Sequence, residues 1–254
     1  MYPCEVISRP IEKFSTMKSE LNYVLASFIN RPNRFLAQTQ IISSQEIVYA
    51  HVPDPGRLKE LLLPSAQVIL IKNNNPKRKT QYSLVGVKND SIWVNINSQV
   101  SNRLFQIEYS KLSRFQNYVL IKPEFSYQNS RIDFLMENRN HESNPIKTLI
   151  EVKSSTLVKD KVAMFPDAPT SRGVKHVNEL TESLLSGYDA EIVFLIKRSD
   201  AVEFRPFKEM DPKFYSALKL AKEKGVKLCA ALCRYDPIVK KELSIMKEIP
   251  IVGI

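Results

Sequence analysis

The sequence predicts an α+β protein of two domains, in which a small β-barrel precedes an α/β sandwich with a mixed sheet. Residues 35–97 read as short strands that are rich in β-branched and aromatic side chains and separated by turn residues. After residue 99 helical spacing appears, and helices then alternate with apolar strands. We therefore expect a weakly structured lead-in at 1–20, a barrel domain at 21–98 and a second domain at 99–254.

The barrel is predicted from the number and shortness of its strands. Five strands in about 65 residues are typical of a closed or nearly closed barrel, because closure removes exposed edges, and an oligonucleotide-binding (OB) barrel is the natural candidate. Between the second and third strands we expect a sharp turn at 54–56 and two helical turns at 57–63, ended by Pro64. The five strands are FLAQTQII, EIVYAHV, AQVILIK, YSLVGVK and SIWVNIN.

The second domain is predicted in the order α-β-β-β-α-β-α-β. Its two later helices begin at Ser, Thr or Pro signals and end at Gly187 and Gly225, which suit the left-handed residue after a helix. The strand at 190–197 is apolar throughout, as expected for a strand buried on both faces. In chain order the elements are a helix at 101–115, strands at 118–127, 131–136 and 147–155, a helix at 169–188, a strand at 190–197, a helix at 211–225 and a strand at 226–233.

The charge of the chain indicates a polyanionic partner. The net charge is +10 and the isoelectric point is near 9.4, which favours nucleic acid or an anionic membrane face. The excess is more concentrated in residues 21–98, which carry nine Lys and Arg against four Asp and Glu. No apolar run approaches the roughly 18 residues of a membrane span, so we expect DNA as the partner and no membrane.

Cysteine and histidine usage predicts a cytoplasmic protein without zinc. Three cysteines form neither a disulfide framework nor paired C-x-x-C hooks, and the three histidines lie far apart in sequence. Free thiols of this kind are most simply core residues in a reducing compartment. The N-terminal segment lacks the apolar stretch of a secretory signal.

One loop of the barrel concentrates positive charge. The stretch NNNPKRKTQY places Lys77, Arg78 and Lys79 consecutively between two expected strands. It is interpreted either as a solvated hairpin tip or as a phosphate clamp, with Tyr82 as a stacking surface beside it. Trp93 alternates with Ile92 and Val94 and is interpreted as a core residue or a stacking platform, with the core favoured.

A charged pair interrupts the strand KTLIEVKSS. Alternate side chains of a strand point the same way, so Glu151 and Lys153 share a face with Leu149. For an isolated E-x-K, the simplest interpretation is a solvated Glu–Lys pair on an edge strand.

The preceding strand changes that interpretation, because RIDFLM supplies a second acid. Ile132, Phe134 and Met136 are expected on one face of this strand and Asp133 on the other. If the two strands form a hairpin, the carboxylates of Asp133 and Glu151 can converge on one hard cation such as Mg²⁺. The neighbouring lysine could then contact a phosphate or orient an attacking water, as in a phosphodiesterase.

Several strings resemble one known family. The order of a helix, three strands that carry Asp and then Glu-x-Lys, a helix and a strand resembles the PD-(D/E)XK nuclease superfamily. The strings HVPDPGRLKELL, NPKRKT, NRL, SRIDFL, IEVKSSTL and FPDAPTSRGVKHVNEL together resemble the sugar fermentation stimulation protein (SfsA) family. The resemblance implies an OB-like barrel, a PD-(D/E)XK nuclease-like second domain, and DNA binding without strong sequence preference.

The resemblance also implies roles for individual residues. Asp133, Glu151 and Lys153 match the catalytic positions, and the two acids would hold Mg²⁺ or, as a substitute, Mn²⁺. His176 also matches the family but is more typical of a solvated or capping histidine, and Asp167 belongs to the matching string FPDAPTSRG. The expected nucleic-acid contacts are Arg57, Lys77, Arg78, Lys79, Arg131, Arg172 and Lys175.

The chain departs from the family pattern at two places. The barrel turn has Asp54 where the family usually has Asn, which weakens an expected phosphate contact. The helix carries Gln106 and Ile107 where the family tends to have acids. The third acid of the metal site is therefore left between Glu108 and Glu124.

Two functions remain open at this point. The intact D…ExK set favours an Mg²⁺-dependent nuclease, whereas the displaced helical acid favours a DNA-binding regulator of sugar metabolism with an idle site. RNA is a third target, because neither the barrel nor a phosphate site distinguishes the sugar.

Overall fold

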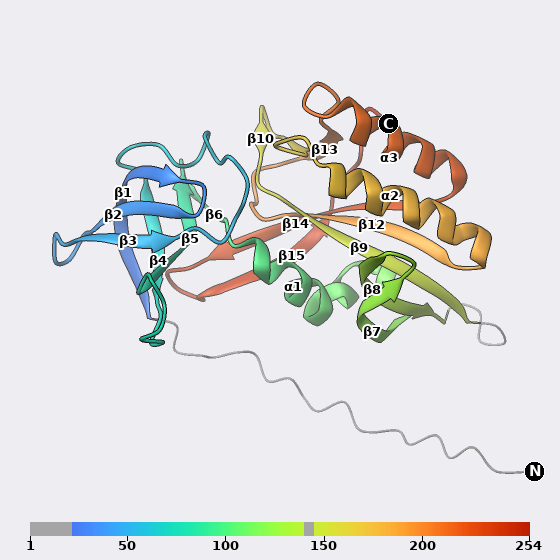
Figure 1. Ribbon diagram of the computed structural model, residues 1–254, viewed down its shortest axis with the longest axis horizontal. Helices are drawn as coiled ribbons and strands as arrows, with labels where there is room; N and C mark the ends of the chain where they lie inside the picture. Colours follow the sequence, from blue (N-terminus) through green and yellow to red (C-terminus); the bar gives the residue numbers. More distant parts are fainter. Residues whose placement is uncertain (1–21, 140–144) are drawn as a thin grey trace, which may run out of the picture.

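The computed structural model describes residues 22–139 and 145–254, so the expected lead-in at 1–20 lies outside the described residues (Figure 1). The barrel lies beside a larger domain in which helices cover a twisted sheet (Figure 1). No helix within the described ranges combines the length and the apolar content that a membrane crossing requires.

The first domain is a closed barrel. β1 pairs antiparallel with both β2 and β4, and β5 pairs with β4 and closes the barrel through a short parallel pairing with β3. Buried side chains of these strands, such as Phe28, Val68 and Leu84, fill its interior. The strands are β1 (Tyr23–Asn33), β2 (Leu36–Ile41), β3 (Ile47–His51), β4 (Gln67–Lys72), β5 (Tyr82–Asn89) and β6 (Ile92–Asn95).

The barrel differs from the sequence expectations at β1 and at residues 57–63. β1 was not predicted as a strand, because register shifts at Phe28 and Asn30 break its alternation and Pro32 lies near its end. The predicted last strand forms β6, which pairs with β5 of the barrel and, through Trp93, also with β14 of the second domain. Residues 57–63 form turns instead of a helix. Leu58 has a positive φ of 51°, which a right-handed helix does not accept.

The second domain follows the predicted order of helices and strands and adds short strands to it. β9, β12 and β14 are parallel, β8 pairs antiparallel with β9, and β7 lies at the edge, so the sheet is mixed. The elements are α1 (Ser101–Glu108), β7 (Tyr118–Tyr127), β8 (Ser130–Asn138), β9 (Ile146–Ser155), β10 (Val158–Lys159), β11 (Val162–Phe165), α2 (Ser171–Ser183), β12 (Asp189–Ile196), β13 (Glu203–Pro206), α3 (Pro212–Lys224), β14 (Lys227–Asp236) and β15 (Glu242–Glu248).

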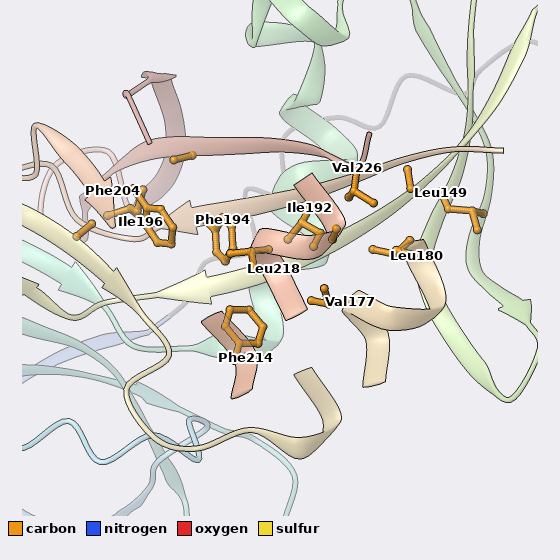
Figure 2. Packing of buried hydrophobic residues seen from close by; sticks show 14 of the residues in the cluster. Leu149, Val177, Leu180, Ile192, Phe194, Ile196, Phe204, Phe214, Leu218 and Val226 are labelled. Atoms are coloured by element: carbon orange, nitrogen blue, oxygen red, sulfur yellow. The ribbon is translucent and has the colours of Figure 1, made fainter. Parts of the chain in front are cut away.

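Helices cover both faces of this sheet. α2 and α3 pack over a cluster that contains Val177, Phe194 and Leu218 (Figure 2), and α1 packs over a second cluster that contains Phe105 and Ile150. The caps explain where α2 and α3 begin. Thr170 accepts the backbone N–H of Gly173, and Asp211 accepts that of Phe214. A left-handed Gly225 ends α3 as predicted.

The two domains share a sheet. Among the described residues, twelve strands form one continuous sheet in which β6 pairs with β14 through Trp93 and Tyr235. Trp93 is half-buried at this junction, so the expectation that it lies in the core is wrong. β10, β11 and β13 form a separate, smaller sheet.

Candidate metal site and nucleic-acid surface

The candidate site forms where β8 and β9 separate. Their ladder runs to the pair Phe134–Ile150 and stops before Asp133 and Glu151. An oxygen of Asp133 instead accepts the backbone N–H of Val152 at 2.7 Å, in the place of a ladder carbonyl. The side-chain order of β8 changes at the same point, because Ile132 packs under α2 and α3 whereas Phe134 packs under α1. The prediction that these two share a face is therefore wrong.

Asp133 is held by a second donor from α1. Asn102 donates its side-chain N–H to the other Asp133 oxygen at 2.6 Å. Burial and the nearby negative charge of Glu151 nevertheless raise the pKa of Asp133 to about 6. The charge of Glu151 therefore acts on Asp133, and the sharing of one cation by the two carboxylates stays a prediction.

Glu151 lies deeper than Asp133. Its Oε1 accepts from the ammonium of Lys153 at 2.6 Å and lies 2.5 Å from Nδ1 of His176, while its Oε2 is buried without a hydrogen-bond partner in the described structure. Burial acts to raise the pKa of Glu151, but Lys153 and His176 outweigh it and the pKa is lowered. The carboxylate therefore stays ionised at neutral pH, with Oε2 available as a ligand.

The simplest interpretation of the E-x-K pair is wrong. β9 is an interior strand between β8 and β12, and the side chains of Lys153 and Glu151 are only 12% and 4% exposed. Taking both charges out of water is costly and offsets much of their attraction. Stabilisation of the fold is therefore a weak explanation for this buried ion pair.

His176 was expected to be a solvated or capping residue and is instead buried against Glu151. Arg172 donates its Nε–H to His176 Nε2 at 3.4 Å, which leaves Nδ1 as the donor toward the carboxylate. Helical spacing was the available signal, because His176 follows the buried Gly173 by three positions and precedes the buried Leu180 by four. No comparable signal marked Asn102.

The structure excludes Glu108 as the third acid. Its two oxygens bind the backbone N–H of Ile245 on β15 and the ammonium of Lys111, because the residue ends α1 beside that strand. Glu124 lines the same cavity as Asp133 and forms an exposed ion pair with Arg131 at 3.5 Å.

A two-carboxylate site suits Mg²⁺. Within residues 22–139 and 145–254, no group of three His, Cys, Asp or Glu side chains is close enough to hold a metal ion. Mg²⁺ is commonly bound through one or two carboxylates and keeps water or phosphate as its other ligands. The buried, unpartnered Oε2 of Glu151 beside Asp133 therefore fits that ion.

A cavity of about 910 Å³ adjoins this site. It lies between α1 and β7, and Asp133 and Phe134 form part of its wall. Most of the remaining wall consists of apolar side chains and the amides of α1 and the turn before it.

Three expected nucleic-acid contacts lie near the carboxylates. Arg131 is two residues from Asp133 and stays exposed apart from its ion pair with Glu124. Arg172 contacts His176, and Lys175 donates to the carbonyl of Asn129, so both lie on the α2 side of the site.

The other expected contacts lie on the barrel. Lys77, Arg78 and Lys79 are exposed in the loop between β4 and β5, at the end of the barrel opposite the turn at 53–57 (Figure 1). Tyr82 is 9% exposed within the barrel core, so its expected stacking role is wrong.

The exposed aromatic residues of the barrel were not predicted. Phe35 directly precedes β2 and is 52% exposed, and Tyr49 lies on β3 and is 51% exposed. Either ring could stack on a base.

The turn at 53–57 joins the domains and does not offer its amides to phosphate. The backbone N–H of Gly56 donates to Asp54, and that of Arg57 donates to Asp167 at 3.1 Å, while the Arg57 side chain stays exposed. Arg31 donates to the carbonyls of Asp54, Gly56 and Arg57. The expected phosphate contact is therefore replaced by carboxylates of the protein itself.

Family models match both domains. Residues 29–96 match the model described as the SfsA N-terminal OB domain, and residues 97–238 match the sugar fermentation stimulation protein RE domain. The chain belongs to the SfsA family. The resemblance found in its sequence strings is thereby confirmed.

Relatives of the SfsA family cover most of the chain. The sugar fermentation stimulation protein homolog of Clostridium beijerinckii is 43% identical over 215 residues, which are 85% of this chain and 92% of the relative. That of Ruminiclostridium cellulolyticum is 45% identical over 206 residues, 81% and 88% of the two chains.

A solved structure of Pyrococcus furiosus SfsA in complex with Ca²⁺ is also similar. It has a TM-score of 0.79 and 27% identity, and the match covers 91% of this chain and 96% of the other. The predicted architecture, an OB-like barrel followed by an α/β sandwich with a mixed sheet, is confirmed.

Proposed function

We propose that this SfsA family member is an Mg²⁺-dependent nuclease that binds DNA largely without sequence preference. One observation carries the proposal: Asp133 and Glu151 lie on adjacent strands where the ladder between β8 and β9 stops, and Glu151 Oε2 is buried there without a hydrogen-bond partner in the described structure. The solved complex of the Pyrococcus furiosus relative with Ca²⁺ supports a role for a divalent cation.

Different side chains would have different roles in phosphodiester hydrolysis. Asp133 and Glu151 would hold Mg²⁺, or Mn²⁺ in its place, and when bound this ion supplies an activated water and neutralises charge on the phosphate. Lys153 offers a positive charge to the scissile phosphate or orients the attacking water. His176 and Asn102 position the carboxylates through their hydrogen bonds.

Positive charge supports DNA as the substrate. Arg131, Arg172 and Lys175 flank the site and can contact phosphates, and the chain carries a net charge of +10. Phosphate contacts fix position without reading bases, which fits weak sequence preference.

A second candidate is a DNA-binding regulator without cleavage. It is favoured by the orientation of Glu108, which contacts β15, and by the lack of any cluster of three potential metal ligands among the described residues.

A plasmid assay separates the two functions. Supercoiled plasmid is incubated with the full chain, with Mg²⁺ or with EDTA, and nicked or linear product is measured. For a nuclease we expect product only with Mg²⁺, none from Asp133→Asn or Glu151→Gln, and DNA binding close to the parental level in both variants. Parental protein that binds the plasmid and leaves it intact would establish the regulator.

A further inference from the structure

The cavity beside Asp133 has walls suited to a flat apolar surface. Ile107 and Tyr109 from the α1 side and Val119, Leu120 and Pro123 from β7 line it. Its volume of about 910 Å³ lies within the range of small-molecule sites, roughly 300–1,000 Å³.

The polar groups of the cavity narrow the class of occupant. Gln99, Asn102, Arg103 and Gln106 line it from one face, because their spacing places them along one side of a helix. A purely apolar occupant would cut these amides off from water without giving them a new partner, which is costly, so they disfavour such an occupant. The cavity wall carries one cation, Arg103, and two carboxylates, Asp133 and Glu124, and this charge balance disfavours a bare anion. A neutral ring with donors and acceptors on its edge fits both conditions.

The position of the cavity beside the proposed metal site indicates which kind of ring would occupy it. Asp133 contributes both to the cavity wall and to the proposed metal site. A strand whose phosphate lies at the metal would therefore place a neighbouring base at the mouth of the cavity. A base that is paired and stacked in a duplex cannot enter such a pocket without leaving the helix.

We propose that this cavity receives an unpaired nucleobase, so that the preferred substrate is single-stranded or locally unpaired DNA. This inference rests on the proposed function and names the substrate class of the same site. The apolar walls supply stacking, and the side-chain amides of Gln99 and Gln106 bond to the base edge.

The first test compares the binding of matched DNAs to the full parental chain in EDTA, so that the strands stay intact. Fluorescence anisotropy measures the affinity of a single strand, of the same strand with abasic central positions, and of the corresponding duplex. We expect the duplex and the abasic strand to bind at least about tenfold more weakly, the scale of one lost stacking contact. Equal affinity for all three would overturn the inference.

A fluorescent reporter at the cavity provides the second test. Ile107 is 56% exposed, so Ile107→Trp should fold with an indole at the cavity wall. Leu220→Trp is the matched control, because Leu220 is 49% exposed on α3, across the sheet from α1. After subtraction of the parental signal from Trp93, single-stranded DNA should quench the new indole at 107 more than duplex or abasic DNA does, and leave that at 220 unchanged.

The outcomes distinguish the two proposals. Binding of the single strand without selective quenching at position 107 would overturn the base cavity and leave the nuclease proposal standing. Failure of every DNA to bind would overturn the proposed function and this inference together.

Discussion

Asp133 and Glu151 are neighbouring carboxylates whose pKa values move in opposite directions. Burial and Glu151 raise the pKa of Asp133 to about 6, whereas Lys153 and His176 lower that of Glu151 in spite of its burial. Glu151 is therefore a fixed negative charge, and Asp133 is the carboxylate that titrates near neutral pH. An unfavourable charge kept in this way is typical of a functional site.

The raised pKa of Asp133 predicts a specific pH dependence of stability. Between pH 3.8, the pKa in the unfolded chain, and about pH 6, Asp133 is protonated in the folded state but ionised in the unfolded state. The free energy of unfolding therefore falls as pH rises through this window, and the full destabilisation by the ionised carboxylate is present at pH 7. Asp133→Asn removes this cost, and we expect it to raise the free energy of unfolding at pH 7 by up to roughly 3 kcal/mol.

Urea unfolding of Asp133→Asn and of the parent at several pH values measures this difference. The gain should shrink as pH falls from 6 toward 4. A variant that is less stable than the parent at pH 7 would contradict the assignment of Asp133 as a strained carboxylate.

Substitution of Lys153 tests the catalytic step separately from metal binding. Lys153→Met keeps the apolar stem and removes the cation, so Mg²⁺ should bind with equal or slightly higher affinity while cleavage falls by at least about 100-fold. Loss of a donor to the buried Glu151 should also cost about 1–3 kcal/mol of stability. Calorimetric Mg²⁺ titration beside a nicking assay measures both effects.

Lys147→Met is the matched control on the same strand, since Lys147 is exposed. It should leave cleavage and stability unchanged. Parental nicking by Lys153→Met would show that the lysine has no catalytic role.

At the scale of single elements, the sequence predicted regular strands and helices better than their distortions. Clear apolar runs and capping signals predicted β12 and α3. β1 was missed because its bulges interrupt the alternation, and the helix at 57–63 was wrong because tertiary packing holds Leu58 in a left-handed conformation. Glu108 was kept as one of two candidates for the third acid because its partner on β15 lies 137 positions away in the chain.

The turn at 53–57 is an element whose close packing can be tested through Gly56. A Cβ at this position would lie 2.5 Å from Oδ2 of Asp167 and 2.8 Å from Oδ1 of Asp54. Gly56→Ala should therefore displace the carboxylate that accepts from Arg57 and destabilise the protein by about 1–3 kcal/mol.

Denaturant unfolding followed by Trp93 fluorescence, at the domain junction, measures this loss. Asp167→Ala removes one of the two crowded carboxylates, so in combination with it Gly56→Ala should cost less than it does alone. Strict additivity of the two changes would show that Gly56 is not crowded by Asp167.

At the scale of the whole molecule, one sheet connects two separately packed domains. The barrel has its own core, and the second domain has clusters on both faces of its sheet. The sequence predicted this division through its change of pattern near residue 98. It could not predict the pairing of β6 with β14, since one strand pair between distant segments leaves no local periodicity.

The distribution of charge over the molecule gives the last prediction. The loop of Lys77, Arg78 and Lys79 lies at the end of the barrel opposite the turn that contacts the second domain, so it can contact only DNA that extends along the barrel. If it contacts phosphates, neutralising its three cations should flatten the slope of log affinity against log salt by roughly 1 to 3 units, since each lost contact contributes about 0.9. Replacing Lys213, Lys219 and Lys224, exposed on α3, by Gln removes the same net charge and serves as the control. Anisotropy titrations at several salt concentrations should show the change only for the loop variant. Equal slopes in the two variants would mean that this loop is a solvated tip and that DNA is held by the cations around Asp133.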